Sequence, residues 1–259
     1  MKITFLGTCA GTEPMPGRRH TSLVIEHDGG LYWFDAGEGC SYNAHLRGMD
    51  LLTTRAIFIS HRHIDHVGGL PNLVWTIRKL NTRSALEPKP MHGRTLRVIV
   101  PRMETWNAVW ELLREYKDRT FQIEPSTTRD GVVWDADGLR VIAAHNRHLG
   151  EPAEGESWES FSFRIEAGGK SIVFSGDVAD ISELHPLLGG ADLVLMETGH
   201  HKVEDVCTYL SDSGLAPGEL GFIHHGRAIL ADPDGELEKA KGILGDRVFL
   251  ADDGMELEL

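Results

Sequence analysis

Residues 59–69, with the sequence ISHRHIDHVGG, place three histidines and one aspartate between an apolar run and a pair of glycines. Alternate residues of an extended segment point to the same side, so His61 and His63 can converge on one ion while Asp65 and His66 reach a neighbouring one. Imidazole nitrogen and carboxylate oxygen suit Zn²⁺, with Mn²⁺ or iron as substitutes. A histidine-rich surface loop needs neither the strand before it nor the glycines after it. The segment therefore predicts a metal site.

Length and apolar content predict one domain over residues 1–259. With 41% hydrophobic residues the chain can bury an ordinary core, and it shows no linker, low-complexity tract or repeat. No apolar run approaches the ~18 residues that span a bilayer, and the apolar start at residues 3–6 is shorter than the ~7–15 residues of a signal-peptide core. The three cysteines, Cys9, Cys40 and Cys207, are odd in number and widely spaced, as is typical of a reducing compartment. We expect a cytoplasmic protein with no membrane partner.

The formal net charge of −13 limits the classes of partner. Proteins that bind nucleic acid through broad phosphate contacts usually carry a basic face, because counterion release supplies much of the affinity. An acidic chain of this kind is therefore an unpromising general nucleic-acid binder or membrane-surface protein.

Short apolar runs punctuated by Gly, Pro or Asp predict a layered α/β fold. The expected strands are 2–7, 22–27, 31–37, 56–60, 97–101, 140–144, 161–167, 171–176, 192–197, 220–224 and 247–253. The expected helices are 70–80, 104–117, 181–188, 203–212 and 235–243. Two hairpins are expected, at 22–37 and 161–176, since each pair of strands is joined across a Gly-Gly turn. Two polar loops, 83–95 and 147–160, are placed to border a pocket.

The motif HRHIDH resembles the signature of the metallo-β-lactamase fold superfamily. The opening FLGTCAGTEPMPGRRHTSLVIE, followed by WFDAGEGC, is similar more narrowly to the ribonuclease Z and phosphodiesterase branch. The resemblance extends from residue 2 to the closing LADDGMELEL. It implies a four-layer αββα sandwich with two divalent metal ions, Zn²⁺ first among them, at the edge of the facing sheets. It also suggests a homodimer by analogy.

The resemblance implies three further ligands at the ends of later strands. Asp177 in SGDVAD matches the bridging aspartate. The segment GFIHHG offers His224, with His225 as the alternative, and RVIAAHNRHLG offers His148, with His145 as the alternative. The implied arrangement has one ion held by His61, His63 and His148, the other by Asp65, His66 and His224, and both bridged by Asp177 and a water.

Supporting and catalytic roles follow from the same resemblance. Asp35 in FDAGEG is expected to hydrogen-bond a ligand imidazole and fix its tautomer. Two metal ions make a bridging hydroxide available near neutral pH, so hydrolysis is the natural chemistry. Asp65 can accept a proton from that water. Ribonuclease Z enzymes carry a His-Glu-Ala-Thr stretch where this chain reads METGHHKVED, so Glu197 is retained and His200 becomes the candidate proton donor.

The substrate class is predicted from what the chain lacks relative to that branch. tRNA-processing members carry a long basic arm between the ligands that match His148 and Asp177, and here that interval is short and acidic. We therefore expect a phosphodiesterase acting on small phosphodiesters, whose phosphate Arg18, Arg19 and His20 can meet. The alternatives are a ribonuclease Z-type RNA endonuclease, a hydrolase of sulfate esters or thioesters, and a metal-bound sensor or scaffold.

Overall fold

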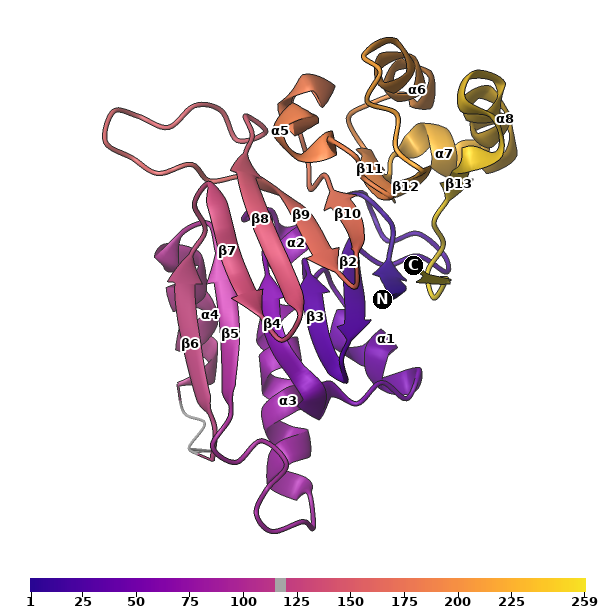
Figure 1. The fold of residues 1–259 in the computed structure, drawn as a ribbon. Helices are drawn as coiled ribbons and strands as arrows, with labels where there is room; N and C mark the ends of the chain where they lie inside the picture. Colours follow the sequence, from indigo (N-terminus) through magenta and orange to yellow (C-terminus); the bar gives the residue numbers. More distant parts are fainter. Residues whose placement is uncertain (115–119) are drawn as a thin grey trace.

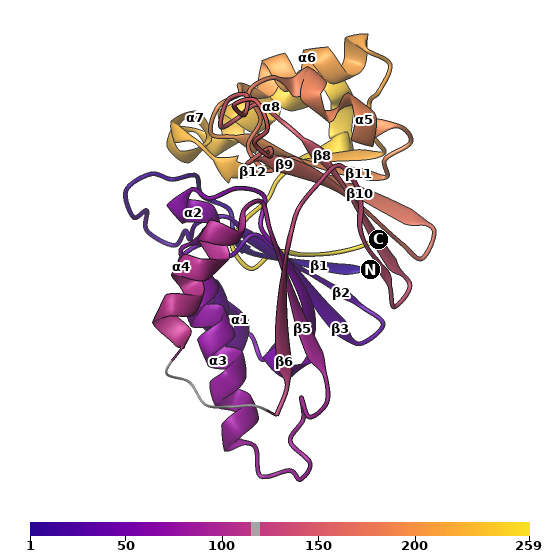
Figure 2. The same cartoon turned by 90° about the vertical axis from the view of Figure 1, so that its left-hand side faces the viewer.

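Residues 1–114 and 120–259 are described in a computed structural model, where they form two facing sheets with helices on both outer sides (Figures 1 and 2). The first sheet has the strand order β14-β1-β2-β3-β4-β5-β6, and the second has the order β13-β12-β11-β10-β9-β8-β7. The expected αββα sandwich of the metallo-β-lactamase fold is confirmed.

The strands of the first sheet are β1 (Lys2–Gly7), β2 (Ser22–His27), β3 (Gly30–Phe34), β4 (Thr54–Phe58), β5 (Thr95–Val100), β6 (Gln122–Thr127) and β14 (Glu256–Glu258). Those of the second sheet are β7 (Gly131–Ala136), β8 (Leu139–His145), β9 (Phe161–Ala167), β10 (Lys170–Phe174), β11 (Leu193–Thr198), β12 (Glu219–His225) and β13 (Val248–Leu250). In each sheet an antiparallel half continues into a parallel half, β3 to β6 and β10 to β13. The carboxyl ends of the parallel strands meet at one edge, which is where ligands bind in sheets of this kind.

Helices cover the outer face of each sheet, as Figure 2 shows most clearly. The first sheet carries α1 (Cys40–Leu46), α3 (Leu70–Arg83) and α4 (Met103–Leu113), and the short α2 (Ile64–Val67) lies within the histidine motif. The second carries α5 (His185–Leu188), α6 (Val203–Asp212), α7 (Arg227–Ala231) and α8 (Pro233–Leu244). The 3₁₀ turns are η1 (Leu51–Thr53), η2 (Ile181–Leu184) and η3 (Gly245–Arg247). No helix among the described residues is long and apolar enough to cross a membrane.

Every expected strand overlaps an observed one, and both expected hairpins form. The strand expected at 31–37 ends at Phe34, because Asp35 has a φ of +58° and leaves the sheet. β6, β7 and β14 were not expected, because their side chains are partly or fully exposed and give no apolar alternation. Of the expected helix 104–117, residues 115–117 lie outside the described part. The segment 181–188 divides into η2 and α5.

Four phenylalanines pack between the two sheets directly beneath the edge where the strands end. The ring of Phe34 in β3 stacks on Phe58 of β4 at 4.9 Å and meets Phe163 of β9 edge-on at 5.9 Å. Phe174 of β10 lies 6.2 Å from the same ring. Phe34, Phe58 and Phe174 immediately precede Asp35, the histidine motif and the segment of Asp177, and Phe163 lies opposite Phe174 in β9. The aromatic layer thus fixes the height at which functional side chains emerge from both sheets.

We predict that Phe34→Ala lowers the free energy of unfolding by about 3–5 kcal/mol, because it leaves a cavity between the sheets. Urea denaturation followed by tryptophan fluorescence measures the change. Val132→Ala is the control, since Val132 is 45% exposed on an edge strand and its truncation should cost little. A loss below 1 kcal/mol for Phe34→Ala would contradict a fixing role for this layer.

Candidate metal centre

The structure brings all seven predicted ligands together from four separate segments. The histidine motif follows β4, His148 follows β8, Asp177 follows β10, and His224 lies near the end of β12. Three overlapping groups form in which the potential ligand atoms lie within 4.8 Å of one another. The first cluster consists of His61, His63 and His148 with Asp177, and the second cluster consists of Asp65, His66 and His224. The third group combines Asp177 and His224 with His200. The first and second clusters together contain all seven predicted ligands, and each is able to bind a metal ion.

Asp177 lies between the two clusters and is almost fully buried. Its Oδ2 lies 3.7 Å from Nε2 of His61 and 3.6 Å from Nε2 of His148. Its Oδ1 lies 3.3 Å from Nε2 of His66 and 3.4 Å from Nε2 of His224. Each carboxylate oxygen therefore faces a different cluster, which is the geometry that a bridging ligand requires.

The donor atoms at this edge fit a pair of divalent cations. Within the described residues, Nε2 of His61, Nε2 of His66 and Oδ1 of Asp177 are buried without a hydrogen-bond partner. Buried polar atoms are nearly always paired, because an unpaired one loses its hydration without compensation. Here the unpaired atoms converge on one another, and they are imidazole nitrogens and a carboxylate oxygen. A cation at the first cluster would satisfy His61, and a cation at the second would satisfy His66 and Oδ1 of Asp177.

Asp35 orients two of the imidazoles, which confirms its expected supporting role. Its carboxylate accepts hydrogen bonds from Nδ1 of His66 at 2.6 Å and from both N–H and Oγ of Ser60 at 2.7 Å. Ser60 Oγ lies 3.0 Å from Nδ1 of His61, and since its proton is donated to Asp35 it accepts from that ring. Both histidines are thus protonated at Nδ1 and turn Nε2 toward Asp177. The role of Ser60 was not predicted, although its position between the strand and His61 was visible.

Charge compensation keeps the carboxylates of the centre anionic. Burial tends to raise the pKa of Asp65, but the hydrogen bond from His224 and the charge of the nearby His66 ring outweigh it and hold the pKa well below its usual value. For Asp177, burial is likewise outweighed by His66 and His224, and its pKa is lowered. Burial lowers the pKa of His148 to about 4. Ionised carboxylates and neutral imidazoles are the forms in which these groups bind metals. Burial is outweighed at His66 and His224, where Asp177 raises the pKa of both rings, that of His224 to about 9, so each would release a proton when a cation binds.

The structure shows that His224, and not its alternative His225, faces the second cluster. Nε2 of His224 lies 3.2 Å from Oδ2 of Asp65 inside the second cluster. His225 points elsewhere, and its Nε2 donates to the carbonyl oxygen of Ala251 at 2.7 Å. The close approach of His224 requires Gly199, because a Cβ at that position would lie 2.6 Å from the ring Nδ1.

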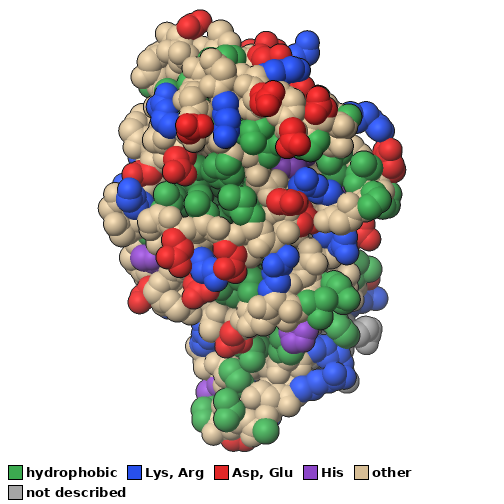
Figure 3. All heavy atoms as spheres, turned by 90° about the vertical axis from the view of Figure 1, so that its right-hand side faces the viewer, with side chains coloured by type: hydrophobic (Ala, Val, Ile, Leu, Met, Phe, Trp, Pro, Cys, Tyr) green, Lys and Arg blue, Asp and Glu red, His purple; other side chains and the backbone are tan. Residues whose placement is uncertain are grey.

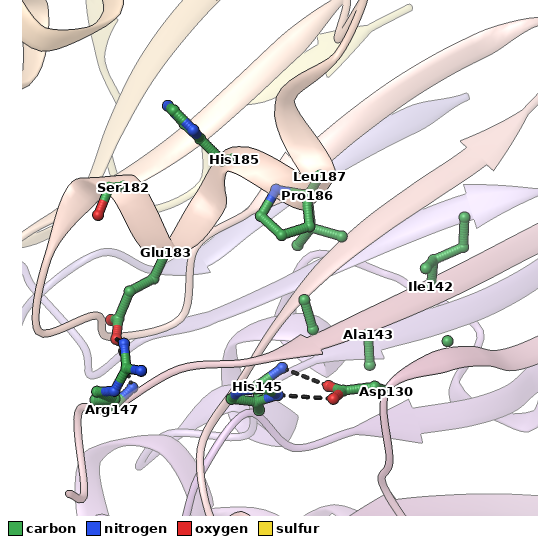
Figure 4. Close-up of a pocket in the computed structure, with 12 residues that line it drawn as sticks. Asp130, Ile142, Ala143, His145, Arg147, Ser182, Glu183, His185, Pro186 and Leu187 are labelled. Atoms are coloured by element: carbon green, nitrogen blue, oxygen red, sulfur yellow. Dashed lines mark hydrogen bonds and ion pairs between the residues drawn. The ribbon is translucent and has the colours of Figure 1, made fainter. Parts of the chain in front are cut away.

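His148 and His145 are separated in the same way. His148 lies in the first cluster, where its Nε2 is 3.1 Å from Nδ1 of His63. Its backbone N–H donates to the side chain of Asn146, which closes the turn that carries it. His145 instead pairs with Asp130 at 2.7 Å and stacks on Trp158. Figure 4 shows it with Asp130 in a separate cavity of about 560 Å³.

A cavity of about 480 Å³ opens over the metal centre, and His200 lines it together with His63 and Asp65. Nδ1 of His200 lies 3.0 Å from Oε1 of the fully buried Glu197, and this hydrogen bond raises the pKa of His200. Burial would raise the pKa of Glu197, but the hydrogen bond from His200 and the His224 ring 3.7 Å away lower it to about 2. His200 is therefore an exposed acid at the rim with a fixed anionic partner.

The expected phosphate contacts of residues 18–20 do not reach this cavity. Arg18 donates to Oγ1 of Thr8 at 2.8 Å and pairs with Asp252 at 3.0 Å. With Arg19 and His20 it lines a different cavity of about 320 Å³. The lining of the metal cavity holds Arg227 instead, which pairs with Glu13 at 2.8 Å.

The profile of the Beta-lactamase superfamily domain matches residues 33–231. The chain belongs to the beta-lactamase superfamily. It is a hydrolase of the metallo-β-lactamase fold with candidate metal-binding clusters. This superfamily member is 26% identical to the ribonuclease Z of Mycobacterium marinum, over 100% of this chain and 99% of the relative.

Solved structures show the same superfamily fold. The short form of human tRNase Z superposes with a TM-score of 0.72 at 20% identity, covering 100% of this chain and 99% of that one. A diphosphatase of the PhnP family superposes with a TM-score of 0.67 at 18% identity, covering 100% and 97%. At these identities the superpositions establish the fold alone.

We predict that Asp35→Asn lowers the affinity for Zn²⁺ by about 10–100-fold, because an amide cannot accept all three hydrogen bonds that orient His61 and His66. Titration of the metal-free protein against a competing chelator measures the affinity. Asp28→Asn is the matched control, since Asp28 has a similar φ of +47° in an exposed turn. Equal affinities for Asp35→Asn and the unchanged protein would refute the orienting role.

Proposed function

We propose that this chain is a dinuclear metal-dependent phosphodiesterase that hydrolyses small phosphodiesters. The observation that carries the proposal is the placement of Asp177, whose two oxygens face two clusters of buried donors. The first position would be held by the first cluster and the second position by the second cluster, with Asp177 shared. Zn²⁺ is the first candidate for both because imidazole dominates the donor set, and Mn²⁺ and iron are the substitutes.

Two bound divalent ions would lower the pKa of a water between them and stabilise the charge that develops on the attacked phosphorus. The side chains of the cavity supply the proton transfers. Asp65, an anion at the cavity wall, accepts the proton that the attacking water loses. As the new P–O bond forms, the bond to the leaving alkoxide breaks, and His200 donates its proton to that oxygen. Glu197 holds the His200 ring by Nδ1, which leaves Nε2 as the donating atom.

The connection between β8 and β9 favours a small substrate over tRNA. This connection projects from the sheets as an extended loop that contains no helix or strand (Figure 1). Its acidic side chains are engaged locally, with Glu159 paired to both Arg62 and Arg102 and Glu156 paired to Arg102. The face in Figure 3 intersperses acidic and basic side chains, in keeping with a net charge of −13. A substrate that fits the cavity over the metal centre needs no extended basic surface.

An RNA endonuclease of the ribonuclease Z type is the second candidate. The observation that favours it is the similarity to ribonuclease Z of Mycobacterium marinum along the whole length of both chains. In that case a partner protein, or another face of this protein, would have to supply the tRNA contacts that are expected of the long basic arm in tRNA-processing members.

A substrate panel tests the proposal. The metal-loaded protein is assayed on bis(p-nitrophenyl) phosphate, p-nitrophenyl sulfate, an acylated glutathione and a 3′-extended tRNA precursor. We expect turnover of the phosphodiester at the highest kcat/KM. Dominant cleavage of the tRNA would establish the second candidate, and dominant turnover of the sulfate or the thioester would establish another ester class. No turnover with two metals bound would mark the chain as a sensor or scaffold and refute the proposal.

We predict that Asp177→Ala lowers bound metal as well as the rate, because the one carboxylate that faces both clusters is removed. Elemental analysis of the purified variant, beside its rate on bis(p-nitrophenyl) phosphate, measures both quantities. Asp130→Ala is the control, since Asp130 is a carboxylate on His145 outside the centre. A variant that keeps two full equivalents of metal and loses only its rate would contradict the bridging role.

We predict that His200→Gln slows hydrolysis of a methyl phosphodiester by about 10²–10⁴-fold while it changes the rate on bis(p-nitrophenyl) phosphate much less. The reason is that p-nitrophenolate leaves without protonation, whereas a simple alkoxide requires it. His185→Gln is the matched control, because Nε2 of His185 is bonded to the hydroxyl of Tyr209 at 2.6 Å and touches none of the residues of the centre. Equal losses on both substrates, or a loss of bound metal, would instead make His200 a ligand or a structural residue.

A further inference from the structure

His224 has an unusual backbone conformation for a side chain that faces a metal centre. β12 pairs regularly with β11 as far as Ile223, and the register then shifts so that Thr198 pairs with His225. His224 is left in the bulge with a φ of +49°, a region that residues other than glycine seldom adopt. Such a conformation persists only where the surrounding structure holds it in place.

The contacts that hold it are made by the next residue, His225, which is fully buried. Its N–H donates to the carbonyl of Thr8 at 2.7 Å, and its carbonyl accepts from the N–H of Ala10 at 3.2 Å. Its ring Nε2 donates to the carbonyl of Ala251 at 2.7 Å. The segment after β1, the segment after β13 and the end of β12 are thereby joined at one residue.

Asp253, in the turn that follows β13, holds Thr8 in place by hydrogen bonds. Oδ1 of Asp253 accepts hydrogen bonds from the N–H and the hydroxyl of Thr8 at 2.9 and 2.8 Å. Arg18 ties the same pair of segments, since it donates to the hydroxyl of Thr8 and pairs with Asp252. Figure 1 shows the two ends of the chain lying side by side in this part of the molecule.

This network contacts the second cluster. Gly11, in the segment that binds His225, lies so close to Asp65 that a Cβ there would be 2.9 Å from the carboxyl carbon. Asp65 is itself 3.2 Å from His224. The first cluster has other supports, because Ser60 orients His61 and Asn146 holds the backbone of His148.

We propose that His225 is a positioning residue that, with Thr8 and the turn 251–253, holds the backbone of His224 and so sets the affinity of the second metal position. The inference rests on the metal centre proposed above. Without this support the backbone of His224 relaxes toward a regular strand, and its side chain leaves Asp65 and His66. The first position does not depend on the network, so the two positions should respond differently when it is broken.

Metal titration of three variants tests the proposal. Metal-free protein is titrated with Zn²⁺ against a competing chelator, and with Co²⁺ while its visible spectrum is followed. We expect His225→Leu to bind one equivalent normally and the other at least 10-fold more weakly. His225→Gln should recover most of that loss, because its amide can donate to Ala251. His145→Leu, which removes a histidine at the end of a strand outside the centre, should match the unchanged protein.

Two backgrounds identify which position is affected. With His148→Ala, which weakens the first position, His225→Leu should weaken the remaining equivalent by the same factor of at least 10, whereas with Asp65→Ala it should change nothing further. Asp253→Ala, which acts through Thr8, should reproduce the selective loss if His225→Leu does not fold. Two equivalents bound with unchanged affinities in a folded variant, or an equal weakening of both, would overturn the proposal. An unchanged protein that binds no metal would refute the proposed function itself, so the two failures are distinguishable.

Discussion

The site depends on one buried carboxylate that lies within 3.7 Å of four imidazole nitrogens. So many polar groups can share a dry space only when their charges compensate one another and each ring presents the correct nitrogen. The charges compensate one another because the imidazoles of His66 and His224 lower the pKa of Asp65 and Asp177. The phenylalanines of β3, β4, β9 and β10 pack between the two sheets beneath these groups. Hydrogen bonds to the other nitrogen of each ring determine which imidazole nitrogen faces Asp177.

Two carboxylates support the centre from opposite sides. Asp35, in the first sheet, orients His61 through Ser60 and His66 directly. Glu197, in the second sheet, holds His200 and lies 3.7 Å from Nδ1 of His224. Each sheet thus contributes one completely buried carboxylate that orients imidazole rings at the centre.

Sequence reasoning located the metal site because four donors stand together in one motif and because strand-forming patterns are strong in buried strands. It could not choose between neighbouring histidines from periodicity, since His148 is positioned by a turn that Asn146 closes and His224 by a bulge with positive φ. It missed β6 and β7, whose exposed faces show no apolar alternation. It also expected Arg18 to meet phosphate, whereas its guanidinium is engaged with Thr8 and Asp252. A contact between residues more than 200 positions apart, such as that of Arg18 with Asp252, produces no recognisable pattern in the sequence around either residue.

The pairing of β1 with β14 has a consequence for folding. β14 is hydrogen-bonded to β1, and the Met1 amino group donates to the carbonyl of Leu259. The carbonyl that receives His225 belongs to Ala251, only a few residues before β14. One edge of β1 and the support of the bulge at His224 therefore form only when residues 251–258 pack against the opening strand. Docking of this one segment couples the closure of the first sheet to the geometry of a side chain at the end of the second.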